Sequence, residues 1–229
     1  HTTVVTESGS VYTFGKGEYG QLGHGEEKTK LVPHQVPPAG FNGERIVMAA
    51  AGFCHTVALS EAGNVFTWGC GRYAQLGLRD LGNKSVPRHV KGRFALQGEH
   101  FSEDEFSSDD SQDDEQQDLT PLGRPLEQNE KFVFVAAGNQ HTVAVTAGGQ
   151  MYTWGYGEGG RLGIGNLTSR MTGRMVPTLV QPGETAEVQV LMAACGVRHT
   201  LAISKKGLLW ACGEGFDGRL GLEDIPRLA

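Results

Sequence analysis

The chain has 229 residues, of which 38% are hydrophobic and 8% aromatic, and this is ample material for a sizeable core. Its formal net charge is −6, and no apolar run reaches the length of about 18 residues that suggests a membrane span. No two of the four cysteines form a Cys-x-x-Cys pair. We therefore expect the cysteines to be small buried thiols in a protein of a reducing compartment, the cytoplasm or the nucleus.

One stretch of the sequence occurs four times with the same internal spacing. Each copy begins with a histidine, has glycines 8 and 14 residues later, and has a Leu-Gly pair that starts 21 residues later. Identical spacing in four copies indicates a repeat architecture. The repeat histidines are His1, His55, His141 and His199, and the second glycines are Gly15, Gly69, Gly155 and Gly213.

Each copy predicts a β-hairpin followed by a structured loop. The residues after the histidine are β-branched, small or apolar over a short run, which favours a strand. The first glycine suits a turn position with positive φ, and a second short strand follows it. The glycine-rich segment that comes next predicts a loop whose leucine enters the core. We therefore expect strands near residues 2–6, 11–14, 56–60, 65–68, 142–146, 151–154, 200–204 and 208–211.

Two further strands are expected in each unit. A Pro-x-x-Val segment predicts a short third strand, because proline is tolerated at a strand start or sheet edge. An apolar run then predicts a fourth strand that closes the unit and is buried on both faces. The third strands are predicted at 33–36, 87–90 and 177–180, and the fourth at 46–52, 133–138 and 188–196. Four strands per unit of roughly 55 residues predict an all-β propeller of four-stranded antiparallel blades.

The second unit contains an insertion. His55 and His141 are 86 residues apart, whereas the flanking pairs of repeat histidines are 54 and 58 residues apart. The extra residues lie near 95–125 and include ten acidic residues between 99 and 118, with no Lys or Arg. Such a block repels itself and cannot bury enough apolar surface to order, so it predicts a disordered insert. The expected units are 1–46, 47–131, 132–190 and 191–229.

The charge of the insert suggests several roles. Without its ten acidic residues the rest of the chain carries four more basic than acidic residues. The insert could fold back onto a basic rim, reach a basic partner such as histones, or act as a solvated spacer. Ser102 and Ser111 each have an acidic residue three positions later, so they are candidate phosphorylation sites for an acidophilic kinase.

The repeated motif can be written A-[AC]-G-x-x-H-T-x-A-[LVI]-[ST]-x-x-G-x-[LMV]-[YFW]-x-W-G-x-G-x-x-G-[QR]-L-G. It resembles the repeat of the regulator of chromosome condensation family over nearly the whole chain except 93–130. WD-repeat and kelch propellers match less well, because no Trp-Asp dipeptide closes the blades and no Gly-Gly opens them. The resemblance implies a ring of about seven units. Four units that begin at a histidine in mid-repeat predict a piece of a larger ring, and a natural four-bladed ring is the alternative.

No pattern in the sequence predicts catalytic side-chain chemistry, a cofactor or a metal site. The repeat histidines could ligate a metal or bond to a backbone carbonyl of a neighbouring blade. Metal ligands must converge to about 2 Å from one ion, whereas equivalent points on adjacent blades lie much farther apart, so we expect the structural role. Gly-x-Gly-x-x-Gly at 15–20 and 155–160 follows a strand but opens no helix, which excludes a dinucleotide fingerprint.

The resemblance places function on exposed rims and loops. In the family, residues just before the repeat histidine face a small GTPase, and Asp or His is prominent there. This chain has Cys54, Gln140 and Arg198 at those positions. We therefore expect a non-catalytic protein-interaction module that binds a protein partner through its rim loops, with no membrane span and no direct nucleic-acid site. Guanine-nucleotide exchange on a Ran-like small GTPase is the alternative.

The resemblance also extends to plant-type ultraviolet-B photoreceptors, which carry Gly-Trp-x-His-Thr. The corresponding segments of this chain, 52–55, 138–141 and 196–199, contain no tryptophan. We therefore reject a photoreceptor function on the sequence.

Overall fold

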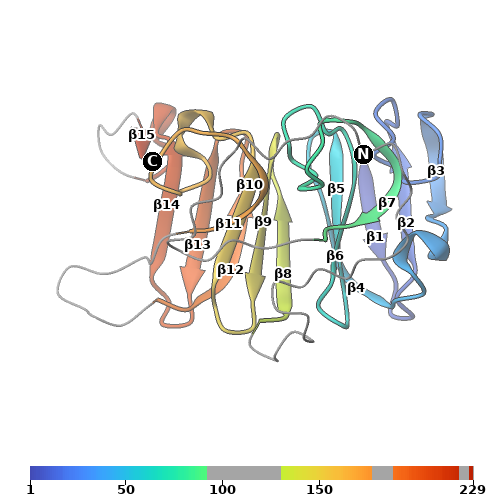
Figure 1. Cartoon of the computed structure of the whole chain (residues 1–229), viewed down its shortest axis with the longest axis horizontal. Coiled ribbons are helices and arrows are strands. Elements are labelled where there is room, and N and C mark those ends of the chain that lie inside the picture. Colours follow the sequence, from blue (N-terminus) through green and yellow to red (C-terminus); the bar gives the residue numbers. More distant parts are fainter. Residues whose placement is uncertain (92–129, 177–187, 222–226, 229) are drawn as a thin grey trace.

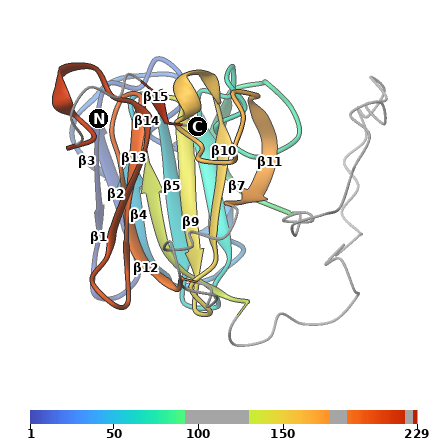
Figure 2. The same cartoon turned by 90° about the vertical axis from the view of Figure 1, so that its left-hand side faces the viewer.

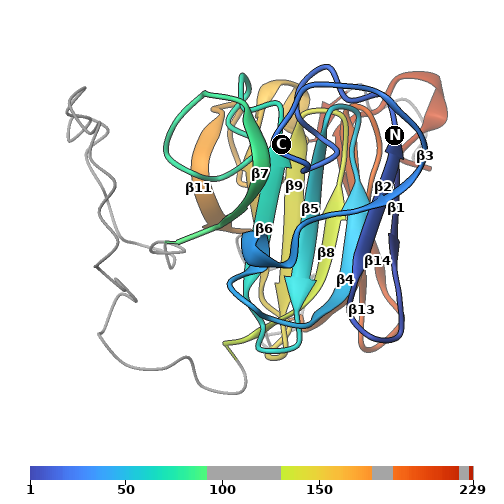
Figure 3. The same cartoon turned by 90° about the vertical axis from the view of Figure 1, so that its right-hand side faces the viewer.

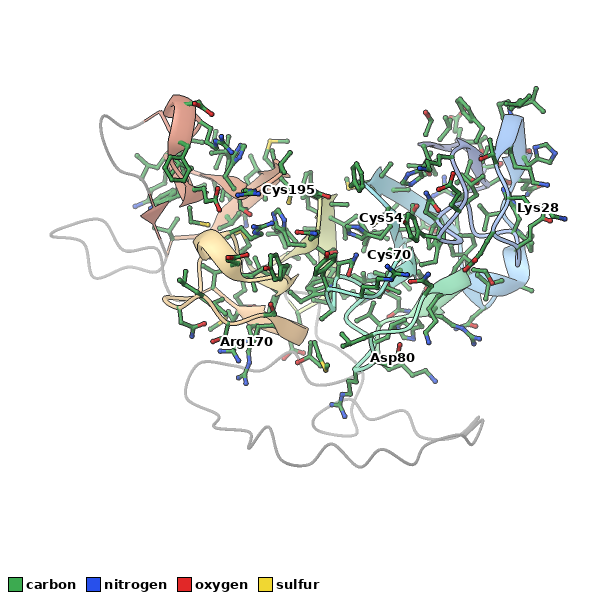
Figure 4. All side chains as sticks on the ribbon, turned by 90° about the horizontal axis from the view of Figure 1, so that it is seen from above. Lys28, Cys54, Cys70, Asp80, Arg170 and Cys195 are labelled. Atoms are coloured by element: carbon green, nitrogen blue, oxygen red, sulfur yellow. The ribbon has the colours of Figure 1, made fainter. Side chains whose placement is uncertain are left out.

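Four antiparallel β-sheets stand side by side along an arc in the computed structural model, which describes residues 1–91, 130–176, 188–221 and 227–228 (Figure 1). Seen from above, the sheets fan outward, with one edge of each near the centre of the arc and the other at its periphery (Figure 4). The two perpendicular side views show strands that run nearly parallel to one axis in every sheet (Figures 2 and 3). This arrangement is the blade architecture that the repeat predicts.

The strands of the four sheets follow one another in chain order. The first sheet contains β1 (Thr2–Val5), β2 (Val11–Gly15) and β3 (Lys30–Gln35). The second contains β4 (Ile46–Ala51), β5 (His55–Ser60), β6 (Val65–Gly69) and β7 (Lys84–His89). The third contains β8 (Phe132–Ala137), β9 (His141–Thr146), β10 (Met151–Gly155) and β11 (Arg170–Met175). The fourth contains β12 (Val190–Cys195), β13 (His199–Ser204), β14 (Leu209–Glu214) and β15 (Arg227–Leu228).

The eight hairpin strands predicted from the repeat are confirmed, and the largest boundary difference is that β14 runs three residues farther than expected. Helical structure in the described residues is limited to three short 3-10 segments in loops: η1 (Pro38–Phe41), η2 (Glu158–Gly160) and η3 (Phe216–Gly218). No helix in the described ranges is long and apolar enough to cross a membrane.

The third strands differ from the prediction. β3 and β7 begin three residues earlier than expected, and β11 ends before the predicted segment 177–180, which lies outside the described residues. The strand registers explain the error, because Thr13, Thr67 and Thr153 pair with His34, Arg88 and Arg174. The residue at position 173 is therefore the equivalent of Pro33 and Pro87, and it is a glycine. The predicted segment 177–180 begins instead at the next proline of the sequence, Pro177.

The predicted fourth strand opens the next sheet rather than closing its own unit. β4 pairs with β5, to which a turn of only three residues connects it, and β8 and β12 pair with β9 and β13 in the same way. Burial on both faces was also wrong. These strands form the inner edge of the second, third and fourth sheets. The register skips one residue in each strand, which leaves its side chain exposed: Val47, Val133 and Leu191.

The hydrophobic core lies in the seams between neighbouring sheets. Side chains of β5 and β6 pack against those of β8 to β10, and similar clusters fill the other two seams. Trp68 and Trp154 are fully buried there. The loop leucines enter the core as predicted: Leu22, Leu76, Leu162 and Leu220. Each blade therefore depends on its neighbours for burial of its faces.

The predicted insert 95–125, with Ser102 and Ser111, lies outside the described residues. The described chain on either side ends at Lys91 and begins again at Glu130. β7 runs away from the end of its sheet that holds His55, and β8 runs toward the end of its sheet that holds His141, so both flanks lie at the opposite end of the sheets.

Candidate partner-binding rim

One end of the four sheets, which we call the upper rim, gathers two kinds of loop. The short turns between the first and second strands contribute residues 52–54, 138–140 and 196–198, and the glycine-rich loops contribute 16–23, 70–77, 156–163 and 215–221. They share this end because His55 pairs with Gly69, and the equivalent residues pair in the third and fourth sheets. Figure 4 looks down onto this rim.

The repeat histidines join successive sheets just below the upper rim. His55 Nε2 lies 2.9 Å from the hydroxyl of Thr142 in the next sheet, and that hydroxyl donates to the carbonyl of Gln75 at 2.7 Å. A hydroxyl has one proton to donate, so the histidine must be the donor in the first bond. The same relay links His1, Thr56 and the Gln21 carbonyl, and also His141, Thr200 and the Arg161 carbonyl. The sequence predicts a direct bond from the histidine to a backbone carbonyl. The structure instead places a threonine hydroxyl between the histidine and the carbonyl.

Burial favours the neutral form of the His55 and His141 imidazoles. Burial lowers the pKa of His55 to about 4 and that of His141 to about 3. Their Nδ1 atoms have no hydrogen-bond partner. A Cβ added at Gly138 would lie 2.3 Å from the His141 ring, so only glycine fits beneath it. Within the described part of the chain, no group of three or more His, Cys, Asp or Glu residues is placed to hold a metal ion.

The three residues predicted to contact a partner all lie in the turns of the upper rim, on three successive sheets. Cys54 is buried, Gln140 is half-buried and Arg198 is exposed. Each is instead held by a side chain of its own sheet. Gln75 Nε2 donates to Cys54 Sγ at 3.8 Å, Arg161 Nη1 donates to Gln140 Oε1 at 3.4 Å, and Arg198 Nη1 donates to the Glu214 carboxylate at 3.1 Å.

Sequence reasoning missed the exposed apolar residues one position earlier in two of these turns. Phe53 is 73% exposed and Val197 is 54% exposed. Their turns are connected in series, since the Phe53 N–H donates to the Gly138 carbonyl at 3.2 Å and the Asn139 N–H to the Gly196 carbonyl at 3.3 Å. An apolar residue directly after a glycine, inside a three-residue turn, is the signal that could have identified this position.

A row of aromatic and arginine side chains crosses three sheets on the same rim. Arg72 lies over the ring of Tyr19, with its guanidinium carbon 6.0 Å from the ring centroid. The rings of Tyr73 and Tyr156 are 5.2 Å apart, and Arg161 lies 5.0 Å from the Tyr156 centroid. We call these five residues the aromatic–arginine row. Cation–π and ring contacts of this kind hold aromatic rings and guanidinium groups against one another without requiring full burial.

Arg161 continues the row into the fourth sheet. Its side chain is buried, and burial lowers the pKa of its guanidinium, an effect that the charge of Glu214 opposes. It donates to the Glu158 carbonyl at 2.8 Å and to the Val197 carbonyl at 3.2 Å. The equivalent residues in the first two sheets are Gln21 and Gln75, which instead accept a backbone N–H of their own loops. The arginine therefore adds a bond between blades that glutamine does not form.

The chain is similar in sequence to known proteins. The chain is 32% identical over 229 residues to the ultraviolet-B receptor UVR8 of Arabidopsis thaliana, covering 99% of this chain and 42% of that protein. It is 33% identical over 222 residues to the E3 ubiquitin-protein ligase HERC2 of Homo sapiens, covering 88% of this chain and 4% of that protein. The chain thus spans less than half the length of these relatives.

Two solved structures share the fold. Human WBSCR16 matches with a TM-score of 0.74 at 24% identity, covering 98% of this chain and 48% of the other. Prp20p from Saccharomyces cerevisiae matches with a TM-score of 0.69 at 24% identity, covering 97% and 45%. The model of the regulator of chromosome condensation (RCC1) repeat matches residues 8–59, 62–96 and 148–203, and a second model of this repeat matches 48–75 and 132–161. Because the repeat model covers more than half of the chain, this protein belongs to the regulator of chromosome condensation repeat family.

Proposed function

We propose that this chain is a non-catalytic interaction module that binds a protein partner through its upper rim. The observation that carries the proposal is the exposure of Phe53, Tyr73 and Val197 on one rim, beside the exposed arginines Arg72 and Arg198. Aromatic residues and arginine dominate the energetics of protein interfaces. Backbone bonds between successive turns hold this surface in a fixed shape, which reduces the entropy lost on binding.

Related propellers support the choice of a protein as the partner. Prp20p has been described together with its binding properties to Gsp1p and histones, and yeast RCC1 has been solved with Kap60 bound. The likeness to these structures concerns the fold, so the partner of this chain is identified only by class. We place the interaction in the cytoplasm or nucleus, and we regard the four sheets as part of a ring of about seven blades.

The acidic insert offers a second contact. Its described flanks, Lys91 and Glu130, lie at the end of the sheets opposite the upper rim. A basic protein bound next to these flanks would therefore leave the upper rim free for another partner.

Guanine-nucleotide exchange on a Ran-like small GTPase is the second candidate. Arg198 favours it, because this exposed side chain lies on the upper rim and is held in place by the buried Glu214. Exchange by such a propeller needs polar groups that disturb the phosphate and magnesium site, and the equivalent positions Cys54 and Gln140 provide no charge. For this reason we place exchange second.

Photo-crosslinking tests the interaction proposal. A photoreactive benzoylphenylalanine replaces Phe53 in the full-length protein, and the matched control carries it at Glu61, an exposed turn residue at the opposite end of the same hairpin. We expect cross-links to a defined protein from Phe53 that disappear when Val197 is changed to Asp. Equal cross-linking from both positions, or none from Phe53, would contradict binding through the upper rim.

Release of fluorescent GDP from a panel of small GTPases separates the two candidates. We expect the full-length protein to leave the release rates unchanged. A tenfold rise, which corresponds to about 1.4 kcal/mol of barrier, would replace the first proposal with exchange if Arg198→Ala abolished it.

A further inference from the structure

Two cysteines lie directly opposite each other at the upper rim, where β5 begins and β6 ends. His55 pairs with Gly69, and the Cys70 N–H donates to the Cys54 carbonyl at 2.8 Å, so the ladder continues by one more pair. Cys54 is 6% exposed and Cys70 is 3% exposed. Figure 4 shows the two residues beside each other on this rim.

The pairing places these thiols within reach of a covalent bond. Directly opposed residues of an antiparallel pair have Cα atoms about 4.5–5.5 Å apart, and disulfides join residues whose Cα atoms are about 4.4–6.8 Å apart. The other two cysteines differ. Cys195 and Cys212 pair with Thr200 from opposite sides, so two strand spacings, about 9–10 Å, separate them. That separation is too large for a disulfide without movement of the backbone.

The surroundings make the two opposed thiols chemically unequal. The hydrogen bond with the Cys54 thiol, together with the backbone N–H and charge of Arg72, lowers the pKa of Cys70. The same hydrogen bond and burial raise the pKa of Cys54. Burial also raises the pKa of Cys195, and it raises that of Cys212 to about 11. Cys70 is thus the thiol that its surroundings favour as a nucleophile.

We propose that Cys54 and Cys70 form an oxidative modification site that hydrogen peroxide converts to a reversible disulfide across β5 and β6. The Cys70 thiolate attacks one peroxide oxygen, the O–O bond breaks, and the departing hydroxide takes up a proton to leave as water. The resulting Cys70 sulfenic acid is attacked by Cys54 sulfur, which loses its proton, and a second water leaves. Two thiols are oxidised by two electrons and one peroxide is reduced to two waters.

The location explains why a small oxidant is required. Both sulfurs are nearly covered, but they lie beside the exposed Phe53 and Arg72 at the surface of the rim. Gln75 Nε2 donates to Cys54 Sγ, and the Gln75 carbonyl accepts the hydroxyl of Thr142. Oxidation therefore removes a hydrogen-bond acceptor from a residue that also joins the second and third sheets.

Peptide mapping of the peroxide-treated full chain tests the proposal. After alkylation without reduction, we expect a linked peptide that contains Cys54 and Cys70, with Cys195 and Cys212 recovered as alkylated thiols. Dithiothreitol should restore all four thiols. Absence of the linked peptide while the protein remains folded, as judged by its circular dichroism spectrum, would overturn the proposal. So would equally fast linkage of Cys195 to Cys212.

Single variants test the order of the two steps. In Cys54→Ser the sulfenic acid at Cys70 has no partner, so we expect it to accumulate and to be captured by dimedone. In Cys70→Ser we expect at least a tenfold slower loss of the Cys54 thiol. Cys212→Ser is the matched control and should form the linked peptide at the rate of the unaltered chain. Faster oxidation of Cys54 than of Cys70 would contradict the assignment of the nucleophile.

Discussion

His55 of the second sheet and Thr142 of the third are joined by a side-chain hydrogen bond of 2.9 Å, and the Thr142 hydroxyl then donates back to the Gln75 carbonyl of the second sheet. The bond requires a proton on Nε2. Because His55 is fully buried and its Nδ1 has no partner, a second proton there would add an unpaired charge inside the seam. The contact between blades thus depends on the protonation state of one histidine.

The first prediction concerns pH. Burial lowers the folded-state pKa of His55 to about 4, whereas histidine in an unfolded chain has a pKa of about 6.5. Between these values the unfolded chain binds more protons than the folded chain, so the free energy of unfolding falls as the pH decreases through this window. We expect a loss of up to about 1.4 kcal/mol per pH unit from this residue, measured by urea unfolding between pH 7 and 5, where few carboxylates titrate.

Replacement of single histidines isolates this contribution. His55→Gln retains an amide donor for Thr142 but cannot titrate, so its unfolding free energy should depend less steeply on pH than that of the unaltered chain. His34→Gln is the control, because this ring is exposed and joins no blades. Equal slopes for all three proteins would contradict the buried neutral imidazole.

The second prediction concerns the hydroxyl in the relay. Thr142→Val keeps the shape of the side chain but leaves the His55 N–H without an acceptor. It also removes one donor from the Gln75 carbonyl, which still accepts from Trp154 Nε1 at 3.0 Å. We expect a loss of about 1–3 kcal/mol in urea unfolding at pH 7, because one buried N–H is left unsatisfied. Thr3→Val is the matched control, because the Thr3 hydroxyl is buried without any hydrogen bond in the described structure. That change should leave stability unaltered or raise it, and a similar loss at both sites would show that the relay contributes little.

The spacing of the repeat was sufficient to predict the blades, because each hairpin is defined locally by its histidine, its turn glycine and its apolar residues. It was not sufficient for the third strand of the third sheet, where Gly173 replaces the proline found at Pro33 and Pro87. It also assigned the apolar strand to the end of one unit, whereas this strand opens the next sheet. The residues of a β-strand do not indicate which neighbouring strand it pairs with. The pairing depends on the length of the connecting turn.

The rim positions were predicted only in part. Sequence spacing located Cys54, Gln140 and Arg198 at one rim, but it could not show that side chains of the same sheet already hold them. Those partners are 16 to 21 residues away in the chain. Exposure of Phe53 and Val197 depends on the direction in which a three-residue turn points its side chains, which spacing does not define.

The third prediction concerns the glycine beneath each repeat histidine. A Cβ at Gly138 would lie 2.3 Å from His141 Cε1 and 2.8 Å from the Gly196 carbonyl, so Gly138→Ala must displace the ring or the neighbouring turn. We expect a loss of more than about 2 kcal/mol from this overpacking. Gly82→Ala is the control, since a Cβ there meets only the ends of Asp80 and Lys84 side chains. Thermal unfolding of both variants measures the difference, and equal stability would contradict the close contact.

The fourth prediction concerns the bond between the third and fourth blades. Arg161→Ala removes donors from the Glu158 and Val197 carbonyls and leaves space in a buried site, so we expect a loss of about 2–4 kcal/mol in urea unfolding. Arg161→Gln should cost about 1 kcal/mol less, because glutamine occupies the equivalent position in the first two sheets and satisfies its own loop.

Arg219 provides the matched control for this comparison, because it is the equivalent residue of the fourth sheet and, among the residues that the structure describes, its donors reach only its own loop. Its side chain is partly exposed, and its ion pair with the exposed Asp217 contributes little. Arg219→Ala and Arg219→Gln should therefore each cost less than about 1 kcal/mol. If the two alanine variants lost the same stability, the contact of Arg161 with the neighbouring blade would add nothing to the bonds within its loop. If Arg161→Gln were as unstable as Arg161→Ala, glutamine could not replace arginine in this loop.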